Sequence, residues 1–287
     1  MLHSDIFWQW LVGSAPNSIL GVTMQSGDII SVSFRPGMFV LSFILSALGA
    51  YVALEAASRI RNEDGGLRVG YVLVAAFALG GVTIWGMQFL GMAAQRYSFP
   101  VGYEFGLTLL TLVISLVIAG AALWHVGRAA FSPWRCIVSG CVTGAVMTGV
   151  NYLGMDAVHT QGVLTWSAFG VAASVVIAAA AATLSLWLAF HVQSESQRRV
   201  AASVMALSVG GSHYTGVLAC TFIYVPKAEQ DTLILEGTWL PYIVFALCLA
   251  MLAVMRLQLA RATRVYQQRL KARMDALLES RDTPSAG

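Results

Sequence analysis

Charged residues are scarce in this sequence. Of its 287 residues, Asp, Glu, Lys and Arg make up 11%, whereas hydrophobic residues make up 57% and the mean hydropathy is +0.72. A soluble domain carries about 25% charged residues, so this chain lacks the polar side chains that a water-facing surface requires. The high hydrophobicity also excludes a disordered chain. The composition therefore predicts a polytopic membrane protein.

Cysteine is also scarce, and the common catalytic motifs are missing. The sequence has no Walker motif, nucleophile elbow, HExxH motif or glycine-rich dinucleotide loop. We therefore predict that the chain is not an enzyme, and a membrane-embedded metalloenzyme is disfavoured because no general base is evident. The cysteines lie in apolar runs without a CxxC pair, which excludes a disulfide framework and a CxxC zinc site; they are Cys136, Cys141, Cys220 and Cys248.

Seven apolar stretches are long enough to cross a membrane. A bilayer core about 30 Å thick needs about 20 apolar helical residues, and the alternating pattern of an outer-membrane barrel is absent. We predict an all-α membrane protein, a seven-transmembrane helix bundle in which short connections make neighbouring helices antiparallel. The predicted spans are Met38–Ala57, Val69–Ala94, Phe105–Val126, Cys136–Val158, Trp166–Val192, Val200–Val225 and Trp239–Leu259.

Basic residues predict the orientation of this bundle. Fourteen of the 17 Lys and Arg follow spans 1, 3, 5 and 7. The positive-inside rule then places the N-terminus outside and the C-terminus in the cytoplasm, and the net charge of +3 is no sign of nucleic-acid binding. Residues 1–37 form an extracytoplasmic segment without the features of a cleaved signal; with Trp8 and Trp10 it lies on the membrane surface or is a loosely ordered tail.

One motif occurs three times, near the outer ends of spans 2, 4 and 6. Each copy reads glycine, any residue, a polar residue, an aromatic residue, any residue, glycine, then Met or Val. The copies are Gly86–Met92 (motif 1), Gly149–Met155 (motif 2) and Gly211–Val217 (motif 3). A fixed period of two helices predicts three tandem helix pairs around a pseudo-threefold axis, followed by a seventh helix.

The polar position of each motif lies in the outer half of the bilayer. At 1.5 Å per residue, Gln88, Asn151 and His213 are roughly 28, 22 and 20 Å from the inner edge. Polar side chains at such depth normally face the bundle interior, so a symmetric repeat makes the three converge. Met92 and Met155 follow Gln88 and Asn151 by four residues and share their helix faces.

The repeated motif resembles that of the MHYT domain, a bacterial integral-membrane sensor family. The family motif reads Met-His-Tyr/Phe-x-Gly-Met; Ser212–Gly216 is the most similar copy, and the resemblance covers about residues 35–257. It implies a multi-pass protein of the bacterial inner membrane that binds copper and senses a diatomic gas such as oxygen, carbon monoxide or nitric oxide. Related chains often end in a diguanylate cyclase, a phosphodiesterase or another output domain.

This sequence departs from the family motif at its metal ligands. Gln88 and Asn151 replace two of three histidines, and amides are poor copper ligands, whereas imidazole and thioether suit Cu(I). The remaining candidate copper ligands are His213, Met92, Met155 and Met87. The resemblance implies a small-ligand site formed by Gln88, Asn151, His213, Tyr152 and Tyr214.

Two alternatives compete with a sensor site. A hydrogen-bonded cluster of Gln88, Asn151 and His213 can serve only to hold the helices together, in a degenerate family member without metal. Alternatively, the polar residues line a transport path or channel. Against transport, the cytoplasmic half of the spans lacks a matching chain of buried polar residues.

The C-terminal residues predict a basic cytoplasmic helix that continues from span 7. The segment Arg256–Arg281 holds seven basic residues, and apolar residues recur in it at helical spacing: Tyr266, Leu270, Met274 and Leu277. Such a helix can lie on anionic lipid or pair with a helix of a signalling partner. Residues 260–287 thus form a cytoplasmic tail, and because no output domain follows, we expect any signal to leave in trans.

Overall fold

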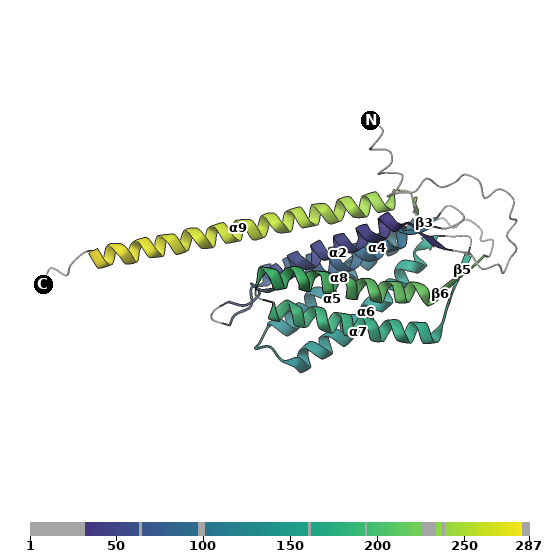
Figure 1. Ribbon diagram of the computed structural model, residues 1–287, viewed down its shortest axis with the longest axis horizontal. Helices are drawn as coiled ribbons and strands as arrows, with labels where there is room; N and C mark the ends of the chain where they lie inside the picture. The colour runs from purple at the N-terminus through teal and green to yellow at the C-terminus, as the bar shows by residue number, and fades with distance from the viewer. Residues whose placement is uncertain are drawn as a thin grey trace, which may run out of the picture.

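In the computed structural model, long helices pack side by side in one bundle (Figure 1). The structure describes residues 32–282 except 63–64, 97–100, 160–161, 193, 225–233 and 237–238, so Trp8 and Trp10 lie outside the described residues. The chain is an all-α membrane bundle, as predicted. The helices are α2 (Pro36–Ala57), α3 (Val69–Ala76), the π-helix η1 (Phe77–Gly86), α4 (Met87–Ala93), α5 (Phe105–Gly127), α6 (Pro133–Asp156), α7 (Ala168–His191), α8 (Glu195–Leu218) and α9 (Leu240–Asp282).

Six of these helical segments are long and apolar enough to cross a membrane, counting α3, η1 and α4 as one. The helix α8 is not among them, because its first turns carry Glu195, Arg198 and Arg199 and its later turns carry serines and His213. It nevertheless packs between α2 and α7. The crossing of the bilayer by α8 therefore stays a prediction.

The second predicted span is continuous but not uniformly α-helical. Its central ten residues form the π-helix η1, which leads directly into motif 1. Inside η1, Thr83 donates from Oγ1 to the carbonyl of Ala78, five residues earlier, and its own carbonyl accepts a bond from Ser46 of α2. Stretches of π-helix are rare and often occur at functional sites.

Short antiparallel strands close one end of the bundle, which we call the strand end. The strand before the first helix of each pair bonds to the strand after the second helix, so the repeat is strand–helix–helix–strand. The pairs are β1 (Ser33–Phe34) with β2 (Gln95–Arg96), β3 (Gly102–Glu104) with β4 (Val158–His159), and β5 (Gly162–Trp166) with β6 (Cys220–Tyr224); β7 (Ile234–Glu236) also pairs with β3. The opposite end, with the connections after α2, α5 and α7, is the loop end.

These strands correct three predicted span boundaries. Val158 and Trp166 belong to strands, and the span predicted at 200–225 is a helix from Glu195 to Leu218 followed by β6. Residues Cys220–Tyr224 are rich in aromatic and β-branched side chains, which favour a strand once a partner such as β5 is present.

The last helix, α9, extends well beyond the bundle (Figure 1). Its first part packs against α2, η1 and α4. The seventh predicted span and the predicted tail form one continuous helix of 43 residues. Beyond the bundle, Tyr266, Leu270 and Met274 are exposed. The side chain of Leu277 lies outside the described residues.

Candidate functional site

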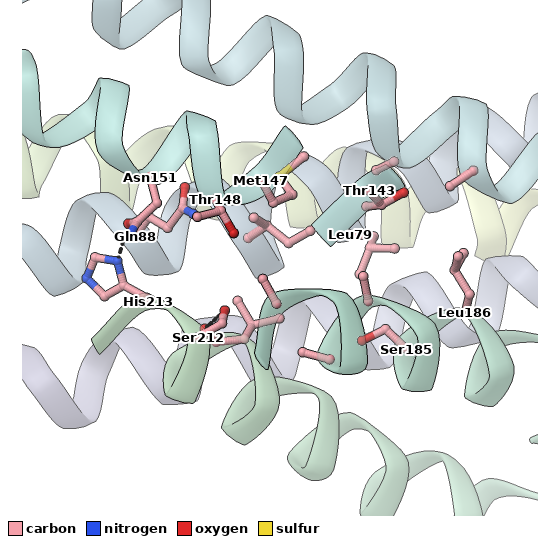
Figure 2. Close-up of a pocket in the computed structure, with 17 residues that line it drawn as sticks. Leu79, Gln88, Thr143, Met147, Thr148, Asn151, Ser185, Leu186, Ser212 and His213 are labelled. Carbon is pink, nitrogen blue, oxygen red and sulfur yellow. Dashed lines mark hydrogen bonds between the residues drawn. The ribbon is translucent and has the colours of Figure 1, made fainter. Parts of the chain in front are cut away.

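The three polar motif residues meet at one end of an internal cavity. The cavity, of about 40 Å³, lies between η1, α4, α5, α6, α7 and α8. Figure 2 shows Gln88, Asn151 and His213 together at one end of it, with Thr143 and Ser185 at the other. They are 5%, 5% and 1% exposed. The repeat thus brings one polar side chain from each of three helices to a single buried place.

A hydrogen bond joins the motif residues of α6 and α8. Nδ1 of His213 donates to Oδ1 of Asn151 at 2.7 Å. A carbonyl oxygen only accepts, so this bond fixes the proton on Nδ1 and leaves the lone pair on Nε2. It is the one hydrogen bond that the described structure places among Gln88, Asn151 and His213. The amide of Gln88 lines the cavity beside this bond (Figure 2).

The second glycine of each motif receives a side chain from another motif. A Cβ atom on Gly91 of motif 1 would lie 2.7 Å from Nε2 of His213 in motif 3, and one on Gly216 of motif 3 would lie 2.5 Å from Nδ2 of Asn151 in motif 2. A Cβ atom on Gly154 of motif 2 would lie 3.4 Å from Cε of Met92 in motif 1. The three motifs therefore contact one another cyclically, as pseudo-threefold packing requires.

The free nitrogen of His213 points away from the cavity. Nε2 is buried and has no hydrogen-bond partner among the described residues, and it lies beside Gly91, as does the hydroxyl of Tyr214. A buried imidazole nitrogen with a free lone pair is costly unless it binds a donor or a metal. This nitrogen and the neighbouring hydroxyl of Tyr214, which is likewise buried without a partner among the described residues, are the chemically available groups of the site.

The predicted methionine ligands are buried members of motifs 1 and 2. Met87, Met92 and Met155 are at most 3% exposed. Met92 lies against Gly154, and Cε of Met87 lies near Gly210, one turn from His213. In the described part of the chain no group of three or more His, Cys, Asp or Glu residues is placed to hold a metal, so a metal here would depend on one imidazole and thioethers.

The two motif tyrosines occupy different surroundings. The ring of Tyr214 packs against Phe39 and Phe43 of α2 and edge-on against His213. The hydroxyl of Tyr152 instead lies 2.6 Å from Oγ of Ser174 on α7. Tyr214 is therefore next to the free nitrogen of His213, whereas the hydroxyl of Tyr152 is engaged elsewhere.

Buried polar residues also occur deeper in the bundle, contrary to the sequence-based argument against transport. Thr143 and Ser185 line the far end of the cavity (Figure 2), and His125 Nδ1 lies 2.8 Å from Oγ of Ser139 toward the loop end. The missed signal is helical spacing: Ser139, Thr143 and Asn151 recur at multiples of four on one face of α6. Serine and threonine are small and scarcely lower the hydropathy of an apolar span, so they do not stand out in the sequence.

An ion pair connects α2 to α9 at the loop end, and a hydrogen bond connects α2 to α8. Glu55 of α2 pairs with Arg59 at 3.2 Å and with Arg256 of α9 at 2.5 Å. Tyr51 of α2 donates to Glu195 of α8, which also pairs with Arg198. The helix that carries His213 is thus connected through α2 to the start of the α9 extension.

The fold and the site define a class of protein. It is a helical membrane bundle that carries a buried polar site built from a repeated motif, and its last helix projects from the bundle. The family profile described as the MHYT "Bacterial signalling protein N terminal repeat" matches residues 81–139 and 149–202. The chain thus carries the MHYT repeat and belongs with the MHYT-containing signalling proteins, as its motifs predict.

Curated relatives are signalling proteins. The chain is 31% identical over 254 residues to the bifunctional diguanylate cyclase/cyclic di-GMP phosphodiesterase MucR of Pseudomonas aeruginosa, covering 86% of this chain and 36% of MucR. It is 28% identical over 200 residues to the signalling protein YkoW of Bacillus subtilis, covering 67% of this chain and 25% of YkoW. The chain thus spans a quarter to about a third of the length of these relatives. No solved structure matches it.

Proposed function

We propose that this membrane signalling protein binds a Cu(I) ion or a small, uncharged ligand at Nε2 of His213. The observation that carries the proposal is this buried nitrogen, which has no partner among the described residues and lies in the space that glycine at position 91 leaves for the imidazole. The bond to Asn151 supports the proposal, because a hydrogen bond to the other ring nitrogen orients a ligating histidine.

The donor set fits Cu(I) better than harder ions. Imidazole and thioether are soft or borderline ligands that suit Cu(I). His213 would supply nitrogen, and the buried methionines of motifs 1 and 2, which are Met87, Met92 and Met155, would supply sulfur. When bound, Cu(I) would supply the chemistry for binding a small molecule such as a diatomic gas.

The signal would pass from α8 to α9. A ligand at His213 shifts α8, which contacts α2 through Glu195 and Tyr51; Glu55 of α2 in turn pairs with Arg256 of α9. The basic extension of α9 would then act on a cytoplasmic or membrane-bound signalling partner. In this proposal the strand end faces outward from a bacterial inner membrane, as the distribution of basic residues favours, and the membrane domain itself catalyses no reaction.

A second candidate function for the motif residues is purely structural. The His213–Asn151 bond joins α6 to α8, and such bonds between membrane helices contribute about 0.6–2 kcal/mol. In that case the chain is a member of its family without metal, and the site residues only hold the helices together.

Elemental analysis distinguishes these functions. Purified protein is loaded with Cu(I) under reducing conditions, desalted and analysed, with His213→Ala and Met92→Leu as variants and His125→Ala as the matched control. The proposal expects about one copper per chain, lost in His213→Ala and weakened in Met92→Leu, with the control unchanged. Absence of copper from the wild-type protein would refute the metal proposal and favour the structural one.

A further inference from the structure

Besides the hydroxyl of Tyr214 beside His213, two hydroxyl groups inside the bundle have no partner in the described part of the chain. They are Oγ1 of Thr143 on α6 and Oγ of Ser185 on α7. Both residues are about nineteen-twentieths buried, at 5% and 4% exposed, and both line the cavity at the end away from His213 (Figure 2). Because a buried hydroxyl without a hydrogen bond is costly, such a group indicates a partner that is not part of the chain.

Neighbouring hydroxyls show that these missing bonds are not a general property of the helices. Serine and threonine inside a helix commonly bond to the carbonyl one turn earlier. Thr148 donates to the carbonyl of Gly144 at 2.9 Å and Ser212 to that of Val209 at 2.8 Å, although both line the same cavity. The hydroxyls of Thr143 and Ser185 instead remain available to the cavity.

The volume and the lining residues of the cavity limit the size and charge of a molecule that can bind in it. A water molecule needs about 10–15 Å³ of such volume, so a cavity of about 40 Å³ holds two or three waters or a solute with as many non-hydrogen atoms. None of the described residues that line it is an Asp, Glu, Lys or Arg. The bound molecule is therefore neutral and forms hydrogen bonds.

We propose that Thr143 and Ser185 form a second binding site, for neutral hydrogen-bonding molecules of this size. The site is separate from the His213 site, because Thr143 and Asn151 are two helical turns apart on α6, about 12 Å along the axis. Water occupies it when no other solute is present. The site extends the polar interior of the bundle from the motifs toward the loop end and does not depend on copper.

Infrared difference spectroscopy tests this proposal on the full chain. Exchange of H₂¹⁸O for water shifts the O–H stretching bands of internal water. We expect such bands in the wild-type protein, their loss in Thr143→Val/Ser185→Ala, and their retention in the control Thr148→Val, whose hydroxyl bonds to its own helix. Identical bands in the wild-type protein and the double variant, or no bands in either, would overturn the proposal.

A xenon measurement guards against a variant that merely fails to fold. Dry apolar cavities bind xenon, whereas polar, hydrated ones do not. We expect ¹²⁹Xe NMR to detect a site in the folded double variant that is absent from the wild-type protein; xenon in the wild-type cavity would show that it is dry and would refute the proposal. Addition of methanol distinguishes a site for small solutes from a site for water alone. If methanol displaces the water bands, the site binds solutes; if the bands are unchanged, it binds only water.

Discussion

Nε2 of His213 lies 2.7 Å from the position that a Cβ atom on Gly91 would occupy. Real Cβ atoms do not approach another heavy atom so closely, so the imidazole can stand there only because residue 91 is glycine. The same holds for Asn151 and Gly216. The second glycine of motifs 1 and 3 is therefore part of the site, since it makes room for the polar side chain of another copy.

Gly91→Ala is expected to displace His213 and to destabilise the bundle. Inserting a methyl group into a packed interior costs about 1–3 kcal/mol, and the displaced ring would also lose any bound copper. Thermal unfolding in detergent and metal analysis measure the two effects. The matched control is Gly149→Ala, because a Cβ atom there meets nothing within 4 Å. Equal effects of the two substitutions would contradict the proposed role of the second glycine.

Gln88→His is expected to increase copper content or affinity. Gln88 lines the cavity next to the His213–Asn151 pair, so the substitution adds a second imidazole without removing the bond that orients His213. Cu(I) titration against a competing chelator measures the affinity. Gln88→Asn, which adds no ligand, serves as the control. An increase with both variants, or with neither, would argue against a copper site at this position.

Glu55→Gln is expected to loosen α9 at the loop end. Glu55 pairs with both Arg59 and Arg256, and pairs near a surface contribute about 0.5–1 kcal/mol, which corresponds to roughly two- to fivefold faster local opening. Hydrogen exchange over residues 256–263 measures this opening. Lys271→Gln, on the projecting part of α9, is the control. Unchanged exchange in Glu55→Gln would remove the ion pairs from the proposed signalling route.

Cys220 in β6 is expected to resist alkylation up to strongly alkaline pH. Burial, with a smaller contribution from Asp156, raises the pKa of its thiol to about 12, so the reactive thiolate is scarce below that pH. In a variant that keeps Cys220 as its single cysteine, the maleimide reaction rate should rise tenfold per pH unit from 8 to 11. Asp156→Asn should raise the rate at each pH. A plateau near pH 9 would contradict the shifted pKa.

The sequence was sufficient to predict the helices and the meeting of the motif residues. Apolar length identified the spans, and the period of the motif placed Gln88, Asn151 and His213 together, because side chains related by a repeat occupy equivalent positions. The exact bonding was beyond the sequence. The contact of His213 with Asn151 rather than with Gln88 depends on how three helices tilt and rotate against one another.

Other features lacked a signal of their own in the sequence. Strands as short as β1 and β2 gain their bonds only after the helices have brought them together, so local preference does not predict them. Within the π-helix η1, Gly80 packs so closely on α5 that a Cβ atom there would lie 2.4 Å from the carbonyl oxygen of Ser115, a contact between distant residues. The cavity at Thr143 and Ser185 likewise depends on the packing of α6 and α7.

The crossing of the membrane by α8 is the most demanding part of the predicted topology. This helix is more polar than the other spans, yet it carries His213 and packs between α2 and α7. Compartment reporters inserted at residue 193, within residues 229–236 and after residue 282 should read cytoplasmic, extracytoplasmic and cytoplasmic, because basic residues favour the cytoplasmic side. An insertion within residues 128–132, in the connection after α5, should read cytoplasmic as a control. The same compartment for residue 193 and residues 229–236 would place α8 outside the set of spans and would require a different account of how His213 reaches its site.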